Sequence, residues 1–236
     1  MKEIILSLKN VNRIYGKDEA KVEALENINL DIYQGELVAI VGQSGSGKST
    51  LLNIIGGIDR PTSGEVWFKD QDITSFNNRE LTNYRKNSIG FIFQFYNLLS
   101  DLTVKENIRI SLNNKVSNIN IIDDVIGNVG LKGYEDKYPN ELSGGEAQRV
   151  SIARALVKDS DIILCDEPTG ALDYKTGKKI LSLLESIARS KNQTMIIVTH
   201  TKEIAKMCDR IISMRSGKIE SIEENQNILS VEDIEW

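Results

Sequence analysis

The stretch Gly42-Gln43-Ser44-Gly45-Ser46-Gly47-Lys48-Ser49 lies between an apolar run at 37–41 and a helical pattern at 50–55. It matches G-x-x-x-x-G-K-[ST] in full, and a strand before it and a helix after it form the context in which this sequence holds phosphate groups. The glycines let successive backbone N–H groups point inward, and the next helix adds its unpaired N-terminal donors. We therefore interpret residues 42–49 as a phosphate-binding loop rather than as a flexible segment rich in glycine and serine.

A second stretch, Asp161-Ile162-Ile163-Leu164-Cys165-Asp166-Glu167, is an apolar strand pattern that ends in adjacent carboxylates. Mg²⁺ favours one or two carboxylates together with phosphate oxygens, because it loses its water shell reluctantly. We expect Asp166 to hold Mg²⁺ through that shell and Ser49 to bind it directly, while Lys48 reaches the β- and γ-phosphates. In a hydrolase, Glu167 would orient and deprotonate the attacking water. The alternative is that both acidic residues only cap the next helix.

The only histidine of the chain, His200, follows the apolar run at 195–198. Strand ends are the places where open α/β sheets contact their ligands. A lone histidine is more often a satisfied structural residue, so by itself the position of His200 leaves both interpretations open.

The composition fits an intracellular α/β protein. A chain of 236 residues with 40% hydrophobic content is long enough for one large domain or for a domain with an inserted subdomain. The net charge is −5 and both signs are spread along the chain, so we expect no nucleic-acid partner. The longest apolar runs are far below the roughly 20 residues that cross a bilayer, and the N-terminus lacks the apolar core of a signal peptide. The surroundings of Cys165 and Cys208 suggest a reducing, cytosolic compartment.

The apolar patterns divide the chain. Unbroken runs at 37–41, 162–165 and 195–198 are typical of parallel strands covered on both faces and predict a central sheet. Alternating patterns within 4–8 and 25–32, and the stretch 64–68 after a turn, predict half-buried strands.

Helical spacing dominates the region between 101 and 156. A capping box at Thr103–Glu106 opens the first predicted helix, and another amphipathic helix is expected at 175–190. After Ser216 the chain is acidic and weakly patterned. We predict a single domain: a catalytic core at 1–94 plus 161–220, a helical subdomain inserted at about 95–160, and a tail at 221–236.

The stretch Leu142-Ser143-Gly144-Gly145-Glu146-Ala147-Gln148-Arg149-Val150 precedes a helical pattern and offers a second helix N-terminus to an anion. Taken alone, it is equally typical of an ordinary helix start. Together with the phosphate loop, Asp166–Glu167 and His200 in this order, it makes the chain resemble the ATPase subunit of an ABC transporter. The resemblance runs from about residue 6 to residue 217.

One departure lies in the signature sequence of that family, Leu-Ser-Gly-Gly-Gln, because Glu146 replaces the usual glutamine. A carboxylate close to a γ-phosphate would be repelled. Ser-Gly-Gly-Glu is nevertheless common in the group that resembles macrolide-exporter, lipoprotein-releasing and bacitracin-resistance ATPases. We therefore interpret Glu146 as a mark of this subgroup.

The resemblance implies a P-loop NTPase core with a mainly parallel sheet, an N-terminal antiparallel β-subdomain and an inserted α-helical subdomain. It implies ATP and Mg²⁺ as cofactors. Tyr15 would stack on adenine, unless it is a plain strand aromatic, and Asp173 would signal across a dimer, unless it only caps a helix. The implied catalytic residues are Glu167, His200, Gln94 and Lys48, and the implied metal ligands are Ser49, Gln94 and Asp166. The implied nucleotide contacts are Tyr15, Gly42, Gln43, Ser44, Gly45, Ser46, Gly47, Lys48, Ser49, Thr50, Ser143, Gly144, Gly145, Glu146 and Asp173.

Two kinds of partner are also implied by the resemblance. In this family two subunits pair head to tail when ATP binds, so that Ser143 and Gly145 of one close on the nucleotide held by residues 42–50 of the other. An integral-membrane permease subunit would dock near Leu98, Leu99 and Leu102, which would place the chain at the cytoplasmic face of the membrane. Ordinary packing is the alternative role of these leucines.

The function implied is that of an ATP-hydrolysing motor that drives export or extraction of a hydrophobic or peptide-like substrate, with antimicrobial-peptide resistance as one such role. The same motor could instead regulate a membrane protein in cell division or signalling. Relatives that act on DNA or ribosomes carry long coiled coils or paired ATPase domains, which this sequence lacks. A GTPase should show Asn-Lys-x-Asp, but the nearest string is at 114–117 and reads Asn-Lys-Val-Ser. That mismatch disfavours a GTPase, and in either a GTPase or a small-molecule kinase the stretch from Ser143 to Glu146 would go unexplained.

Overall fold

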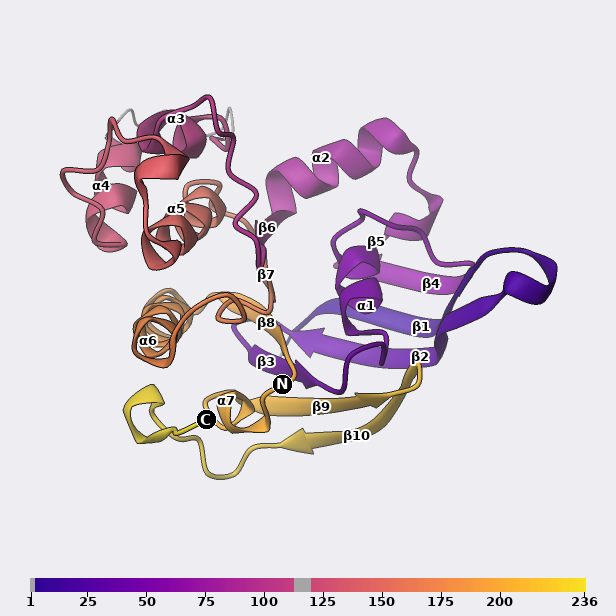
Figure 1. Ribbon diagram of the computed structural model, residues 1–236. Coiled ribbons are helices and arrows are strands. Elements are labelled where there is room, and N and C mark those ends of the chain that lie inside the picture. Colours follow the sequence, from indigo (N-terminus) through magenta and orange to yellow (C-terminus); the bar gives the residue numbers. More distant parts are fainter. Residues whose placement is uncertain (1–2, 113–119) are drawn as a thin grey trace.

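A six-stranded sheet runs through the centre of the computed structural model, which describes residues 3–112 and 120–236 (Figure 1). The three apolar runs form neighbouring parallel strands of this sheet, which confirms the predicted central sheet. The C-terminal edge strand is antiparallel to its neighbour. In spatial order the strands are β10 (Lys218–Glu224), β9 (Arg210–Arg215), β3 (Leu37–Val41), β8 (Thr194–Thr199), β7 (Ile162–Asp166) and β6 (Ile89–Ile92).

The central strands are apolar throughout because both faces of the sheet are covered. On β8, Met195 and Ile197 belong to one hydrophobic cluster, whereas Ile196 and Val198 belong to the other. All four side chains are fully buried. Alternate residues of one strand therefore fill two separate cores, so the whole run must be hydrophobic.

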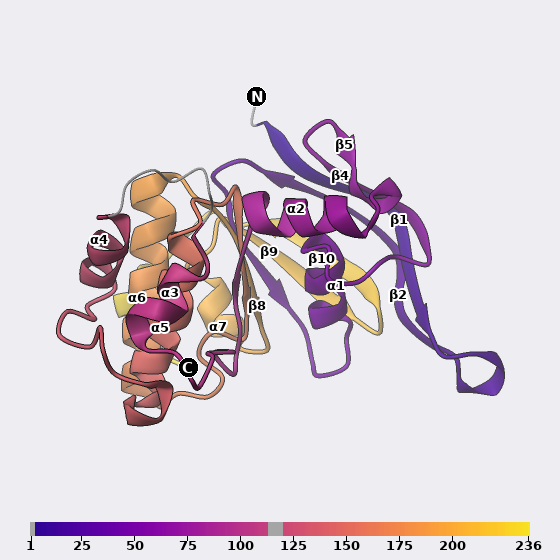
Figure 2. The ribbon, with the colours of Figure 1, turned by 90° about the horizontal axis from the view of Figure 1, so that it is seen from above.

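A second, antiparallel sheet packs over one of these cores. Its strands, in spatial order, are β2 (Val22–Tyr33), β1 (Ile4–Tyr15), β4 (Ser63–Phe68) and β5 (Gln71–Asp72). Helix α1 (Lys48–Ile55) shares this core with both sheets through Leu51 and Ile54. Figure 2 shows α1 beneath α2 (Asn78–Ser88) on this side of the molecule. The N-terminal antiparallel subdomain is thus present.

The other core is covered by helices that come mainly from the segment between β6 and β7. These are α3 (Val104–Arg109), α4 (Ile121–Asn128) and α5 (Gly144–Leu156), followed along the chain by α6 (Tyr174–Lys191) and α7 (Lys202–Ala205). The predicted capping box is confirmed, since the Thr103 side chain accepts from the Glu106 N–H and the Glu106 carboxylate accepts from the Thr103 N–H. Within residues 3–112 and 120–236, no helix combines the length and apolarity needed to cross a bilayer.

Two elements of the structure differ from what the sequence patterns predict. Strand β10 continues through residue 220 to Glu224, so the acidic segment expected to be tail begins as an edge strand. This strand has few apolar side chains, and Ile222 is exposed, so its sequence lacks the pattern of a half-buried strand. Charged edge strands of this kind are common in sheets. Helix α2 was also not expected, because it buries only Leu81 and Tyr84. The string at 114–117 lies outside the described residues.

Candidate functional site

The loop between β3 and α1 has a backbone that side chains other than glycine would obstruct. Gly47 has a φ of 98°, in the left-handed region, and a Cβ at this position would lie 2.5 Å from the Ala24 carbonyl oxygen. A Cβ at Gly42 would collide with the Met214 carbonyl oxygen. The loop therefore fits tightly between β2 and the end of β9, and the first turn of α1 faces the space above it.

Lys48 is folded back over this loop. Its ammonium group donates hydrogen bonds to the carbonyl oxygens of Gly42 and Gln43, at 2.7 and 2.9 Å, and the residue is only 7% exposed. The loop forms the floor of an open cleft of about 1450 Å³. All the loop positions predicted to contact nucleotide, from Gly42 to Thr50, line this cleft, as do Gln94, Glu167 and His200.

Asp166, the last residue of β7, lies next to the start of α1. The Ser49 hydroxyl donates a hydrogen bond of 3.2 Å to its Oδ1. Burial raises the pKa of the Asp166 carboxyl, and the bond from Ser49 partly opposes that shift. A desolvated carboxylate gains from a nearby cation, and carboxylate and hydroxyl oxygens are ligands that Mg²⁺ accepts. The pair Ser49 and Asp166 therefore fits a Mg²⁺ ion beside bound phosphates.

Glu167 and His200 meet at the carboxyl ends of β7 and β8. Nδ1 of His200 lies 3.0 Å from each carboxylate oxygen of Glu167. Since a carboxylate only accepts, Nδ1 carries the proton in this contact. Glu167 has a φ of 48°, a left-handed conformation that is uncommon for residues other than glycine and is concentrated at functional sites. A bond from its N–H to the Val198 carbonyl oxygen holds it there.

Gln94 reaches the same place from the end of β6. A Cβ at Gly170 would lie 2.8 Å from Nε2 of Gln94, so the glutamine packs against the loop that follows Glu167. Because β6, β7 and β8 are parallel neighbours, their carboxyl ends bring Gln94, Glu167 and His200 to one wall of the cleft.

Tyr15 lies at the end of β1, outside the residues that line the cleft. Its hydroxyl donates to Asp59 at 2.7 Å, and the Arg13 guanidinium sits 4.3 Å from the centre of its ring. The exposed Val22 lines the nearest wall of the cleft. One face of the Tyr15 ring is thus already occupied, and its role at adenine stays a prediction.

The stretch around Ser143 forms the start of α5, where the side chains of Ser143 and Glu146 form a capping box. The Glu146 carboxylate accepts from the Ser143 N–H at 2.7 Å and from the Ser143 hydroxyl at 2.8 Å. The bond from the backbone N–H is the main reason why the pKa of Glu146 is lowered. This capping box turns the carboxylate back toward Ser143.

Asp173 caps α6 in a similar way, since its side chain accepts from the Thr176 N–H at 3.1 Å. Hydrogen bonding from Thr176 is the main reason why the pKa of Asp173 is lowered. Neither Asp173 nor residues 143–146 line the cleft. Both ribbon views place α5 and α6 across the central sheet from α1 (Figures 1 and 2). A single chain therefore does not bring the two predicted halves of the nucleotide site together.

Comparison with known proteins identifies the family. The sequence model described as "ABC transporter" matches residues 25–170. The chain belongs to the ABC transporter family. It is 45% identical, over 99% of its length, to a Mycoplasma pneumoniae ABC transporter ATP-binding protein named as an MG065 homolog, and 42% identical, over 93%, to the ABC transporter ATP-binding protein MJ0796 of Methanocaldococcus jannaschii.

The relatives differ in length. The chain spans 51% of the Mycoplasma protein and 97% of MJ0796, but only 34% of the macrolide export ATP-binding/permease protein MacB of Campylobacter fetus, with which it shares 46% identity over 91% of its own length. A solved dimeric structure of MJ0796 in a post-hydrolysis state, bound to ADP and Pi, superposes with a TM-score of 0.87 at 41% identity over 94% of this chain and 99% of that one. The chain is accordingly an ABC ATPase cassette with the predicted fold.

In this ABC cassette, a contact that the sequence did not reveal ties α5 to the loop that follows β7. The Gln148 side chain is fully buried, and its Nε2 donates a bond of 2.9 Å to the carbonyl oxygen of Pro168, just after Glu167. Tyr96 also contacts the start of α5, because a Cβ at Gly144 would lie 2.8 Å from the Tyr96 hydroxyl oxygen. Nothing in the local pattern marks either one, since polar residues in helices and loops usually face solvent.

Proposed function

We propose that this chain is the ATP-hydrolysing motor of an ABC transporter and that it works as an ATP-dependent head-to-tail homodimer. The contact between Glu167 and His200, on the wall of the phosphate-loop cleft, carries this proposal. It joins a general base to the group that orients it, directly above the loop where phosphates would lie.

The residues of the cleft suit ATP and Mg²⁺. Lys48 would exchange its bonds to the Gly42 and Gln43 carbonyl oxygens for contacts with the β- and γ-phosphates, while the backbone amides of the loop and of α1 receive the phosphate oxygens. Ser49 and Asp166, with Gln94, would hold Mg²⁺. When bound, the cation neutralises charge that develops on the transferred phosphoryl group.

Hydrolysis would follow from the placement of the carboxylate. Glu167 accepts a proton from a water lying between it and the γ-phosphate. His200 orients that carboxylate through Nδ1, and the left-handed backbone of Glu167 directs it toward the cleft. Gln94, on the same wall, would position the water. Phosphoryl transfer mainly requires positioning and electrostatic stabilisation, and these residues would position the water and accept its proton.

Dimer closure would complete the site. Residues 143–146 and Asp173 lie outside the cleft of their own chain, so a second copy would supply them. The dimeric MJ0796 structures, at 41% identity, support the formation of a dimer. Each nucleotide would then lie between the phosphate loop of one copy and the signature helix start of the other.

A membrane permease is the proposed partner that turns closure into transport. Relatives named macrolide export ATP-binding/permease proteins support export of a hydrophobic or peptide-like substrate. Phe95 and Leu99, which follow Gln94, are 74% and 50% exposed and form a candidate docking surface at the cytoplasmic face of the membrane.

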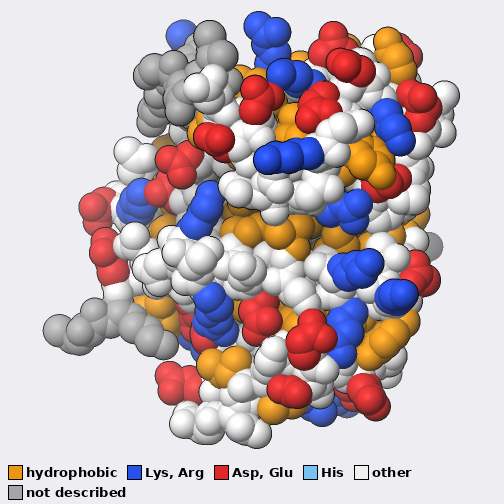
Figure 3. All heavy atoms as spheres, turned by 90° about the vertical axis from the view of Figure 1, so that its left-hand side faces the viewer, with side chains coloured by type: hydrophobic (Ala, Val, Ile, Leu, Met, Phe, Trp, Pro, Cys, Tyr) orange, Lys and Arg blue, Asp and Glu red, His pale blue; other side chains and the backbone are white. Residues whose placement is uncertain are grey.

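On the face seen in Figure 3, acidic and basic side chains are interspersed, a distribution unlike the basic stripe that nucleic-acid binding uses. Cross-linking from Leu99 in native membranes should capture the permease.

Replacing the proposed base tests the motor. We expect Glu167→Gln to bind ATP with unchanged affinity, to hydrolyse it about 10² to 10⁴ times more slowly, and to accumulate as a dimer with ATP and Mg²⁺. Glu65→Gln, at an exposed carboxylate on β4, is the matched control and should behave as the parent protein. Turnover at the parent rate, or monomers on a sizing column with ATP, would contradict the proposal.

A further inference from the structure

The last residues of the chain return along α6 and are anchored there. Asn225 begins this segment, since its side-chain amide donates to the carbonyl oxygens of Lys206 and Cys208. Val231 and Ile234 are 0% and 2% exposed and belong to the same hydrophobic core as α6. We call residues 225–236 the C-terminal segment. A stretch that is acidic and weakly patterned in the sequence, and that we expected to be a tail, is therefore part of the fold.

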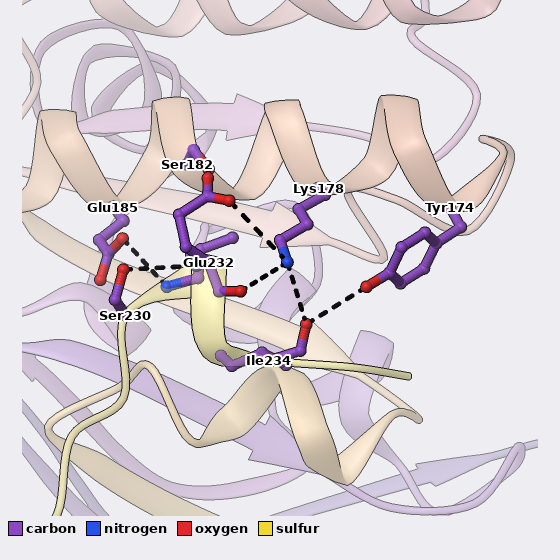
Figure 4. A network of polar contacts seen from close by, with 8 residues as sticks. Tyr174, Lys178, Ser182, Glu185, Ser230, Glu232 and Ile234 are labelled. Carbon is purple, nitrogen blue, oxygen red and sulfur yellow. Dashed lines mark hydrogen bonds and ion pairs between the residues drawn. The ribbon is translucent and has the colours of Figure 1, made fainter.

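Polar side chains on one face of α6 hold this segment (Figure 4). The Lys178 ammonium donates to the carbonyl oxygens of Glu232 and Ile234, at 2.7 and 3.5 Å. The Tyr174 hydroxyl also donates to the Ile234 carbonyl oxygen, at 3.4 Å, and the Ser182 hydroxyl donates to the Glu232 carboxylate. Tyr174, Lys178 and Ser182 are spaced four residues apart, so they share one face of the helix.

Trp236 packs against the first turns of α6. Its ring centre lies 4.8 Å from that of Tyr174, with the planes tilted by 51°. A Cβ at Gly177 would lie 3.5 Å from Cζ2 of Trp236 and 3.4 Å from Cβ of Thr169. The C-terminal segment and the loop that follows Glu167 therefore meet at the same glycine.

The same turns of α6 also border the surface proposed to close on a second copy. Asp173 caps the helix, immediately before Tyr174. A Cβ at Gly145 would collide with the methyl group of Thr176, so the signature glycine rests directly on the first turn. Any shift of this turn would displace both Gly145 and Asp173.

We propose that Trp236 and Lys178 are positioning residues, which clamp the start of α6 so that Asp173 and Gly145 are held in place for dimer closure. This inference rests on the proposed homodimer. The ends of helices fray, and ordering a loose end at the moment of association would weaken binding. A clamp that orders the turn beforehand removes that cost, and it acts without contact to the nucleotide.

The test uses the full chain carrying Glu167→Gln, in which ATP-bound dimers accumulate. Trp236→Ala, Trp236→Phe and Lys178→Met are added singly, and Ile228→Ala, at an exposed apolar side chain of the same segment, is the control. Sedimentation gives the dimer dissociation constant at saturating ATP and Mg²⁺. Fluorescent-nucleotide titration of dilute monomers gives ATP affinity, and a melting temperature reports folding.

We expect Trp236→Ala to raise the dimer dissociation constant about fivefold to tenfold, the effect of losing an aromatic contact, while ATP affinity of the monomer stays unchanged. Lys178→Met should act in the same direction, Trp236→Phe should restore the parent value, and Ile228→Ala should match it. The inference fails if Trp236→Ala and Lys178→Met dimerise as the parent does, or if they weaken monomer ATP binding equally, which would indicate general unfolding. If the Glu167→Gln parent itself stays monomeric, the proposed function fails as well.

Discussion

The starts of α1 and α5 are the two helix N-termini that we propose to receive phosphate, but they differ in the hydrogen bonds that their own side chains already make. Gly47 caps α1 without any side-chain hydrogen bond, so the first amides of α1 face the open cleft. The start of α5 is closed by Ser143 and Glu146, which bond to each other. One side of the proposed site is therefore open within a single chain, whereas at the other side the Glu146 carboxylate already bonds to Ser143 where a second copy would bring its nucleotide.

This difference separates two kinds of variant. Changes on the α1 side should alter nucleotide binding by the monomer, because Lys48, Ser49 and Asp166 already converge there. Changes on the α5 side should leave monomer binding intact and alter only what depends on closure. A variant on the α1 side that spared ATP binding by the monomer, or a variant on the α5 side that weakened it, would contradict this division.

The largest expected effect lies on the α1 side. Lys48→Ala removes the ammonium group that bonds to the loop carbonyl oxygens and would face the phosphates. Two charge-assisted contacts are lost, so ATP affinity should fall at least about 100-fold in an equilibrium titration of the monomer. Lys86→Ala, at an exposed lysine of α2, is the charge-matched control. Unchanged affinity in Lys48→Ala would refute the phosphate loop itself.

His200→Ala should come next, with an effect confined to turnover. The substitution removes the 3.0 Å contact that orients the Glu167 carboxylate, so we expect kcat to fall about 10²-fold while ATP affinity of the monomer is retained. A normal turnover number would make His200 a structural residue. A loss of ATP binding would instead place it on the nucleotide-holding side of the comparison.

The elements of the fold also differ in how far the sequence alone predicts them. The phosphate loop and the strands at 37–41, 162–165 and 195–198 follow from local patterns, and the structure has them at the predicted places. Strand β10 and the C-terminal segment depend on tertiary contacts, such as those of the buried Val231, which scattered apolar residues do not announce. Local sequence patterns are enough to specify the loop and the central strands, whereas packing against distant elements determines the structure of β10 and the C-terminal segment.

At the predicted site, residue identity was easier to infer than residue contact. The resemblance placed Glu167 and His200 in one site, and the structure brings them together because β7 and β8 are parallel neighbours. The self-bonding of Glu146 and the guanidinium over Tyr15 were not expected, because each depends on the orientation of a side chain that several rotamers allow. The roles of these residues toward nucleotide stay predictions.

A smaller effect should come from the contact that joins the two sides. Gln148→Ala leaves the buried carbonyl oxygen of Pro168 without its donor, which should cost about 1 to 3 kcal/mol of unfolding free energy. Since Pro168 follows Glu167, turnover should fall more than monomer ATP affinity does. Denaturant unfolding and kinetic assays measure the two parts. Arg149→Ala, on the next residue of α5, offers a comparison at the same helix start.

The smallest effect should come from Glu146→Gln, which restores the family's usual residue. Because the bond from the Ser143 N–H lowers the pKa of Glu146, the carboxylate is fully ionised at neutral pH, and its stabilising contact is lost only as the pH falls through that lowered pKa. Glutamine also forms capping boxes, so α5 should keep its start and monomer ATP affinity should not change. The negative charge that opposes an incoming γ-phosphate disappears, so the ATP-bound dimer should tighten by about twofold to fivefold at low salt, and less at high salt. Sedimentation of the Glu167→Gln background at both salt concentrations measures this, and a weaker dimer would mean that the Glu146 carboxylate assists closure rather than opposing it.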